Sequence, residues 1–177
     1  MTVDAVEALS IRRLMPEEVR ARAHELADVL IDAVEGGAAV SFLAPMTPLA
    51  AVRWAFDVAD RMGRRAHLFT AEIDGRIVGF VKLVRAGAAN QPHRAEVAKL
   101  VVHRAHRGRG VGAALMHELE VTARVLGITL LTLDTAETGA ACRLYDRLGY
   151  RRAGTIPGYA LAPDGTPVAT VIYYKVL

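Results

Sequence analysis

The chain has 177 residues, of which 53% are hydrophobic and 23% are charged, and its formal net charge is +3. A composition this apolar excludes a wholly disordered protein, and the length fits a single domain with a sizeable core. We therefore expect one globular domain over residues 1–177. The lone cysteine, Cys142, excludes an intrachain disulfide and a cysteine-rich zinc module.

The chain shows no feature that directs it to a membrane or out of the cell. No apolar run approaches the ~18–20 residues that a membrane-spanning helix needs. The opening residues, Met1-Thr2-Val3-Asp4, lack the basic and apolar regions of a signal peptide. We therefore expect a protein without a membrane partner that works in the reducing cytoplasm.

The positive charge is concentrated in the middle of the chain. Residues 1–62 have a net charge of −4, residues 63–112 of +7 and residues 113–177 of zero. A basic block of this kind favours a site for an anion. A nucleic-acid-binding module would interleave aromatic and basic residues, but residues 85–112 contain no Phe, Tyr or Trp. We therefore expect no nucleic-acid partner.

Hydrophobic spacing and turn residues predict helices in the first third of the chain, at 16–33 and 47–63. They then predict two strands joined by a tight turn at Asp74-Gly75, spanning 67–73 and 76–84. After a loop at 85–94, the expected elements are a strand (96–102), a helix (110–126), a strand (128–133), a helix (138–148) and strands (150–153 and 170–176).

Two aromatic residues have open interpretations. Trp54, on the second predicted helix, is expected to pack in the core, with lining of a substrate cleft as the alternative. Residues 155–168 form either a plain hairpin loop or a substrate lid. If the segment is a lid, Tyr159 is its contact residue.

The centre of the chain reads as strand, glycine-rich turn, helix and strand. The two strands, at 95–102 and 128–133, should be parallel and joined by a right-handed crossover. Together with the flanking elements, this βαβ unit predicts one domain of the α/β (α+β) class.

The turn before the central helix has the composition of a phosphate site. It reads His103-Arg104-Ala105-His106-Arg107-Gly108-Arg109-Gly110-Val111-Gly112. Glycines allow close backbone approach, and the helix that follows presents unpaired N–H groups. The spacing matches neither a P-loop nor a dinucleotide-binding fingerprint. The alternative is a tight helix entry with solvated arginines.

The flanking residues point to a family. Arg107-x-x-Gly110-x-Gly112 after a strand resembles the acyl-CoA pyrophosphate motif of the GNAT (Gcn5-related) N-acetyltransferases. The resemblance implies a mixed, mostly antiparallel sheet with a central parallel βαβ unit and helices on both faces. It also implies acetyl-CoA as cosubstrate.

A second motif follows in the family's order. Thr138-x-x-Ala141-x-x-x-Tyr145-x-x-x-Gly149-Tyr150 is similar to the family's Asn-x-x-Ala-x-x-x-Tyr-x-x-x-Gly-Phe. Thr138 stands where the family usually has Asn, and this departure affects a contact to the cofactor chain. Threonine can still cap the helix.

The resemblance implies how the cofactor is held. The pyrophosphate would contact the turn and the start of the helix, namely Arg107, Gly108, Arg109, Gly110, Val111 and Gly112. Backbone groups of Leu100 and Val102 would pair with the pantetheine arm, and one amide would polarise the thioester carbonyl. Thr138 would contact the cofactor chain, and the small side chain of Ala141 would leave room for it.

A closer resemblance concerns the acceptor. Residues 36–42, 94–100, 133–135 and 157–165 look like the tabtoxin-resistance acetyltransferases. That resemblance implies an amino-acid-like toxin or antibiotic as the substrate, although a fold does not determine its substrate.

Tyr145 is the candidate general acid. A phenol with a reference pKa of about 10 stays protonated and can donate to a leaving thiolate, whose reference pKa is about 8.5. The alternative is a core or surface aromatic residue.

Glu96 and Asp134 are the candidate bases. Glu96 lies within an apolar strand, and Asp134 follows the strand at 128–133. An amine must lose a proton before it attacks, so a carboxylate acting directly or through water suits the reaction. The alternatives are a salt bridge from Glu96 to Lys99 or Arg94, an N-cap role for Asp134, or a substrate-ammonium anchor.

The remaining reactive residue types are assigned structural roles. Cys142 has no identifiable His partner and is expected to fill space in the core. His93, His103 and His106 are expected to be solvated or to face phosphate, so we expect no metal.

The leading hypothesis is therefore an acetyl-CoA-dependent N-acetyltransferase that acts on the primary amine of a small molecule, as a monomer or homodimer. The alternatives are a protein or peptide amine acetyltransferase and a non-catalytic acyl-CoA sensor on the same fold.

Overall fold

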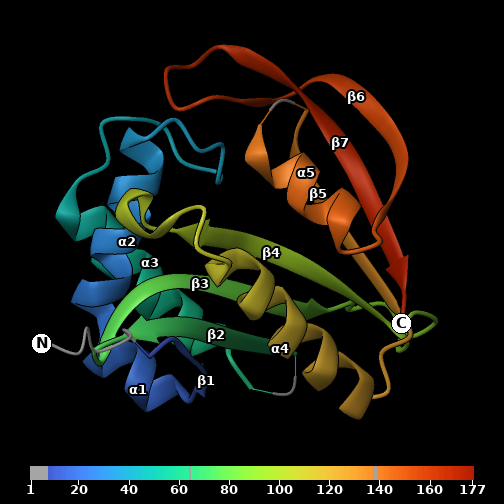
Figure 1. Cartoon of the computed structure of the whole chain (residues 1–177), viewed down its shortest axis with the longest axis horizontal. Helices are drawn as coiled ribbons and strands as arrows, with labels where there is room; N and C mark the ends of the chain where they lie inside the picture. Colours follow the sequence, from blue (N-terminus) through green and yellow to red (C-terminus); the bar gives the residue numbers. More distant parts are fainter. Residues whose placement is uncertain (1–7, 64, 138) are drawn as a thin grey trace, which may run out of the picture.

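A computed structural model describes residues 8–63, 65–137 and 139–177, which form a seven-stranded mixed sheet flanked by helices (Figure 1). The strands are β1 (Ser10–Leu14), β2 (Ala66–Ile73), β3 (Arg76–Arg85), β4 (Arg94–Val102), β5 (Leu130–Ala136), β6 (Arg151–Leu161) and β7 (Pro167–Val176). The helices are α1 (Pro16–Ala21), α2 (Ala23–Glu35), α3 (Pro48–Arg61), α4 (Val111–Val125) and α5 (Ala140–Arg147), with a 3-10 turn at Arg104–His106.

The strand order is β1-β2-β3-β4-β5-β7-β6, and only β4 and β5 run parallel. This arrangement confirms the predicted fold class, with α4 as the crossover between the parallel strands (Figure 1). The family resemblance therefore led to the correct sheet.

The sheet separates two hydrophobic cores. Side chains alternate along a strand, so Leu68 and Phe69 of β2 belong to opposite cores and both are fully buried. Helices α1, α2 and α3 cover the Leu68 side, while α4 and α5 cover the other. Helices thus lie on both faces of the sheet, as expected.

The first predicted helix is interrupted. Arg22 separates α1 from α2, with φ −108° and ψ 20°. Its guanidinium donates to Glu25 at 2.8 Å and to Glu72 on β2 at 2.5 Å. Glu72 is only 5% exposed, so this buried ion pair needs the arginine at that place. Local helical spacing does not reveal such a long-range partner.

The sequence did not predict β1, and it predicted the C-terminal strands too short. β1 is an edge strand that buries only Leu14 among its five residues, so it lacks a hydrophobic pattern. Most of segment 155–168 continues β6 and β7, where a loop or lid was expected. β6 tolerates Pro157 because it is an edge strand, and its register shifts between Ile156 and Ala160.

The parallel strands β4 and β5 separate along their length. They pair only from Arg94–Leu130 to Glu96–Thr132. Beyond this point β4 stays paired with β3, and β5 stays paired with β7. In Figure 1 the two strands start close together near the C-terminus and diverge toward the left. The wedge between them defines the site described below.

Gly79 on β3 permits a close approach that shapes this region. A Cβ there would lie 2.8 Å from the carbonyl oxygen of Val101 and 3.4 Å from Leu115 of α4. We predict that Gly79→Ala lowers the free energy of unfolding by about 1–3 kcal/mol, because backbone cannot move aside as a side-chain tip can. Urea or thermal denaturation measures this change.

Gly154→Ala is the matched control. Gly154 also lies in a strand, and a Cβ there would meet nothing within 4 Å. Equal stabilities of the two variants would contradict the close-approach argument.

Candidate active site

The wedge between β4 and β5 opens into a groove of about 800 Å³, here called the β4–β5 groove. Its walls come from β4, the glycine-rich turn, the start of α4, the end of β5, helix α5 and the loop after α2. Most of the predicted site residues line it: Glu96, Leu100, Val102, Arg107, Gly108, Gly110, Val111, Gly112, Asp134, Ala141 and Tyr145. Arg109 does not line it, and Thr138 lies outside the described residues.

The turn presents backbone to the groove. Gly108 and Gly110 have φ values of +75° and +82°, a region that side chains disfavour. Gly110 is the N-cap of α4, which has no side-chain cap and no acidic residue in its first turn. The positive end of this 15-residue helix is therefore open to an anionic ligand.

The three arginines of the turn have different tasks. The backbone N–H and Nε of Arg104 donate to Asp32 of α2 at 2.7 and 2.8 Å, which anchors the turn. Partial burial opposes the effect, but these hydrogen bonds hold the pKa of Asp32 below its usual value. Arg107 Nε donates to the carbonyl oxygen of Val102 at 2.9 Å, joining the turn to the end of β4. The charge of Arg104 is therefore paired within the protein, although this arginine belongs to the basic turn.

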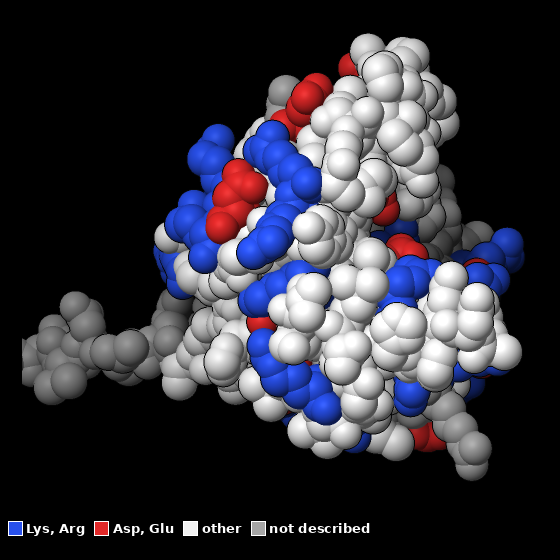
Figure 2. All heavy atoms as spheres, turned by 90° about the vertical axis from the view of Figure 1, so that its right-hand side faces the viewer, with Lys and Arg blue, Asp and Glu red and all other residues white. Residues whose placement is uncertain are grey.

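The basic block of residues 63–112 does not form one continuous surface. Arg94, for example, bonds Gln91 and Thr132 at the start of β4. Figure 2 shows blue basic side chains interspersed with red acidic ones and broad white areas on the face it presents.

The groove side of β4 offers unpaired backbone. Two residues of β4 oppose one residue of β3 where the register shifts between Phe80 and Lys82, and Lys99 has φ +53°. On the other side, β4 has no strand partner beyond Glu96 among the described residues. An extended ligand could therefore pair with this edge as an added strand.

Tyr145 projects from α5 into the same groove and is 5% exposed. The rings of Tyr150 and Tyr173 each lie 5.7 Å from its own. Burial raises the pKa of Tyr145 well above its usual value, and the Asp134 carboxylate adds to the rise. The phenol is therefore protonated at neutral pH, and its hydroxyl can donate a hydrogen bond into the groove.

Glu96 and Asp134 line the groove from neighbouring strands, and both are exposed. Neither side chain makes a hydrogen bond or ion pair with the residues that the structure describes. The expected salt bridge from Glu96 to Lys99 does not form, because the ammonium of Lys99 donates to the carbonyl oxygen of Val40 at 2.6 Å. Gly139 is the N-cap of α5, so Asp134 does not cap that helix. The structural alternatives for both carboxylates are therefore absent.

Sequence reasoning did not identify two lysines at the groove, Lys82 and Lys99. Burial, together with the nearby charge of Lys82, lowers the pKa of Lys99 to about 8, although Asp134 and Glu96 act in the opposite direction. Burial also lowers the pKa of Lys82, with help from Arg61. The alternating pattern of a strand allows a lysine on either face, so it does not show that Lys82 of β3 and Lys99 of β4 line the same cavity.

Other reactive residues are placed away from the groove. Cys142 is buried, and its Sγ lies 3.4 Å from the carbonyl oxygens of Ala136 and Glu137. Tyr159 is 55% exposed and lines neither of the described cavities. Trp54 packs against Phe80 with ring centroids 5.1 Å apart, and it also lines a second cavity. Trp54 is therefore a core residue, as expected, that also borders a cavity.

Among residues 8–63, 65–137 and 139–177, no group of three or more His, Cys, Asp or Glu side chains is placed to hold a metal ion. In the same ranges, no helix combines the length and apolar character needed to cross a membrane.

Residues 28–150 match the model of the acetyltransferase (GNAT) family. The chain belongs to this family. An uncharacterized N-acetyltransferase of Mycobacterium bovis is 36% identical over 93 residues, which is 52% of this chain. The match spans 56% of that relative, so the chain spans little more than half of its length.

Solved structures share the fold of this GNAT chain. A GCN5-related N-acetyltransferase from Kribbella flavida has a TM-score of 0.79 at 23% identity, covering 97% of this chain and 99% of that one. A protein from Salmonella typhimurium, solved with its cofactor acetyl-CoA, has a TM-score of 0.77 at 20% identity, covering 96% and 94%. At these identities the likeness concerns the fold alone.

The environment of Lys99 makes a measurable prediction. The chain has three lysines, Lys82, Lys99 and Lys175, so labelled-lysine NMR can assign each one. We expect Lys99 to titrate near pH 8. Glu96→Gln should lower this pKa further by removing a nearby negative charge, and Lys82→Met should raise it by removing a positive one.

Lys175 supplies the internal comparison, since it is paired with Glu120 at 2.7 Å. A titration of Lys99 above about pH 10, or shifts of the wrong sign in the two variants, would contradict the electrostatic description.

Proposed function

We propose that this protein is an acetyl-CoA-dependent N-acetyltransferase that transfers the acetyl group directly to a primary amine of a small molecule. One observation carries the proposal: the unpaired edge of β4 runs along a groove that ends at the uncapped N-terminus of α4. That combination suits a ligand with an extended amide-containing arm and an anionic end.

The residues present fit acetyl-CoA. Backbone groups of Leu100 and Val102 would pair with its arm, while the turn amides and the guanidinium of Arg107 would meet its pyrophosphate. The missing side chain of Gly112 keeps the passage open, because a Cβ there would lie 3.2 Å from Leu144 of α5. Ala141, on the same helix, contributes a small side chain to the groove wall. In this proposal, acetyl-CoA supplies the activated acetyl group.

The carboxylates fit the role of base. An acceptor amine with a pKa of about 10 must become neutral before it attacks. Glu96 and Asp134 face the groove without competing partners in the described chain, so they would take the proton directly or through water. The bulge at Lys99 turns the backbone where a β4 amide would polarise the thioester carbonyl.

Tyr145 would assist the leaving group. Its raised pKa makes full proton transfer to an ordinary thiolate uphill, so hydrogen-bond donation to the developing charge is the main contribution. Cys142 is not at the groove, which supports direct transfer rather than an acyl-cysteine intermediate.

The loop after α2 supports a small acceptor. Residues 36–41 line the groove, and the N–H of Ala44 in the same loop donates to Pro163 at the tip of the β6–β7 hairpin at 2.8 Å. This contact ties the groove-lining loop to the β6–β7 hairpin, and a loop held in this way would favour a compact acceptor over a protein chain. The resemblance of this loop to tabtoxin-resistance enzymes makes an amino-acid-like toxin one acceptor to test.

Acetyl-CoA binding is the first test. At about 100 times its Kd, acetyl-CoA should raise the free energy of unfolding by about 2.7 kcal/mol. Arg107→Glu and Gly110→Trp should lose this increase, because they place a negative charge or a large side chain at the turn. Differential scanning fluorimetry with and without acetyl-CoA measures the effect.

Arg53→Glu makes the same change of charge at an exposed position of α3 that lines neither cavity, and it should retain the increase. The absence of any melting shift in the parent protein would refute the proposed cofactor.

Tyr145→Phe tests the leaving-group role. We expect kcat to fall about 100-fold or more while the Kd for acetyl-CoA stays unchanged, because only the hydroxyl is lost. A free-thiol assay follows turnover. Tyr159→Phe, at an exposed position, should behave as the parent. Equal kcat values for Tyr145→Phe and the parent would remove the hydroxyl from the mechanism.

A further inference from the structure

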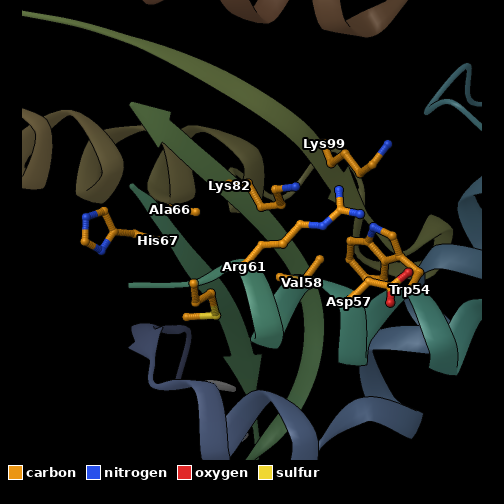
Figure 3. A pocket seen from close by; sticks show the side chains of 9 residues that line it. Trp54, Asp57, Val58, Arg61, Ala66, His67, Lys82 and Lys99 are labelled. Atoms are coloured by element: carbon orange, nitrogen blue, oxygen red, sulfur yellow. The ribbon is translucent and has the colours of Figure 1, made fainter. Parts of the chain in front are cut away.

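A second cavity lies beside the groove, on the side of the sheet that α3 covers. It has a volume of about 190 Å³ and is here called the α3 pocket. Its lining residues are Trp54, Asp57, Val58, Arg61, Met62, Ala66, His67, Lys82 and Lys99 (Figure 3). At ~30 Å³ per water molecule, this space suits a carboxylate with a short carbon chain.

The α3 pocket has an excess of positive charge. In Figure 3 the side chains of Arg61 and Lys82 extend toward each other from α3 and β3. The ammonium of Lys99, on β4, points away from them and donates to the carbonyl oxygen of Val40 at 2.6 Å. The charge of Arg61 helps to lower the pKa of Lys82, and the charge of Lys82 helps to lower the pKa of Lys99. Asp57 is the only acidic residue of the lining.

The other titratable group of the lining does not change this balance. Burial lowers the pKa of His67, so its imidazole is neutral at pH 7 and adds no charge. In Figure 3 the ring also points away from the three cations.

The ammonium of Lys82 has no directly bonded partner among the described residues, although the charge of Glu96 acts on it and favours the charged form. Within the described chain it forms neither an ion pair nor a hydrogen bond, although the side chain is partly buried. Arg61 likewise forms no ion pair with a described residue. A partly buried cation close to a second cation is unfavourable unless an anion joins them. The α3 pocket therefore has the charge of a site for an anionic group.

The pocket and the groove adjoin each other and share two lining residues. Lys82 and Lys99 line both cavities. Glu96 and Asp134 line only the groove, and their charges act on Lys99. The cation Arg61 thus lies on the pocket side of the two shared lysines, and the carboxylates of Glu96 and Asp134 lie on the groove side. A ligand with an anionic end and an amine end matches both ends.

We propose that the α3 pocket binds the carboxylate of the acceptor, through Arg61 and Lys82, while the amine of the same molecule extends toward Glu96 and Asp134. The acceptor class is then small zwitterionic amino acids. The role of the amine as acetyl acceptor rests on the proposed function. Binding of the carboxylate in the α3 pocket does not, because it can be tested without turnover. In the reaction, the acceptor ammonium first gives one proton to the carboxylates. The neutral amine nitrogen then bonds to the acetyl carbon and the carbon–sulfur bond breaks. The second proton of the nitrogen passes to the departing sulfur, so that CoA thiol is released.

The binding test uses probes without an amine. Glutarate and its neutral diamide, glutaramide, are titrated into the CoA-loaded full chain, and the NMR signals of Lys82 are followed. Glutarate should shift these signals and bind at least tenfold more tightly than glutaramide. This preference should fall at least tenfold in Lys82→Met and in Arg61→Gln.

Two variants control for general charge effects. Lys82→Arg keeps the charge and should retain most of the preference for glutarate. Arg53→Gln removes an exposed charge of α3 outside the pocket and should retain all of it. Equal binding of the two probes, or full glutarate binding by a folded Lys82→Met or Arg61→Gln, would overturn the proposal.

Turnover supplies the second readout. In the parent, kcat/KM for amino acids should exceed that for the matching amino acid amides by at least tenfold, and Arg61→Gln should bring this ratio close to one. If no amine releases CoA thiol and acetyl-CoA causes no melting shift, the proposed function fails. The glutarate titration still decides the α3 pocket. A parent that favours the amides would overturn the zwitterionic acceptor.

Discussion

The site depends on the early end of pairing between the two parallel strands. β4 and β5 share three paired positions and then part, which leaves backbone groups of β4 facing a groove. Unpaired backbone groups cost free energy when they are buried. The two strands nevertheless stay apart, because β4 is paired with β3 and β5 is paired with β7 on the sides away from the groove. Helices α4 and α5 stand on the groove's margins, where Gly112 approaches Leu144 closely. If β4 and β5 paired along their whole length, the groove between them would be closed.

Charge is arranged along the same opening. Lys82 and Lys99 are partly buried, and burial lowers the pKa of both. Glu96 and Asp134 are exposed at the groove and free of competing partners in the described residues. A low local dielectric strengthens interactions with a bound ligand, so unpaired groups of both signs can orient a small polar molecule. In contrast, Arg104 pairs with Asp32 and serves to hold the turn. The basic block of the sequence therefore divides into charges that are paired within the fold and charges that line the groove.

The predictions succeeded where local pattern and spacing carry the information. Glycines at 108 and 110 adopt the left-handed backbone that their positions require, and Tyr145 lies one turn beyond Ala141 on a helix at the groove. The predictions failed where a residue or strand far away in the sequence determines the local structure. The break at Arg22 depends on Glu72, about fifty residues away, and an edge strand such as β1 buries too little to show a period. The extended hairpin of β6 and β7 was obscured by Pro157, which only an edge strand accommodates.

The sequence by itself determined the class of fold, the family resemblance and the glycine-rich turn before α4, because hydrophobic periods, glycine conformations and motif spacing are local properties of the chain. It also named both groove carboxylates, although their freedom from partners could not be read from it. Only the tertiary structure decided which charges meet. Lys82 and Arg61 come from β3 and α3, distant in sequence, and they share the α3 pocket because the sheet and the helix pack face to face. Burial and pairing depend on such packing, so the charge of a cavity appears only once the chain has folded.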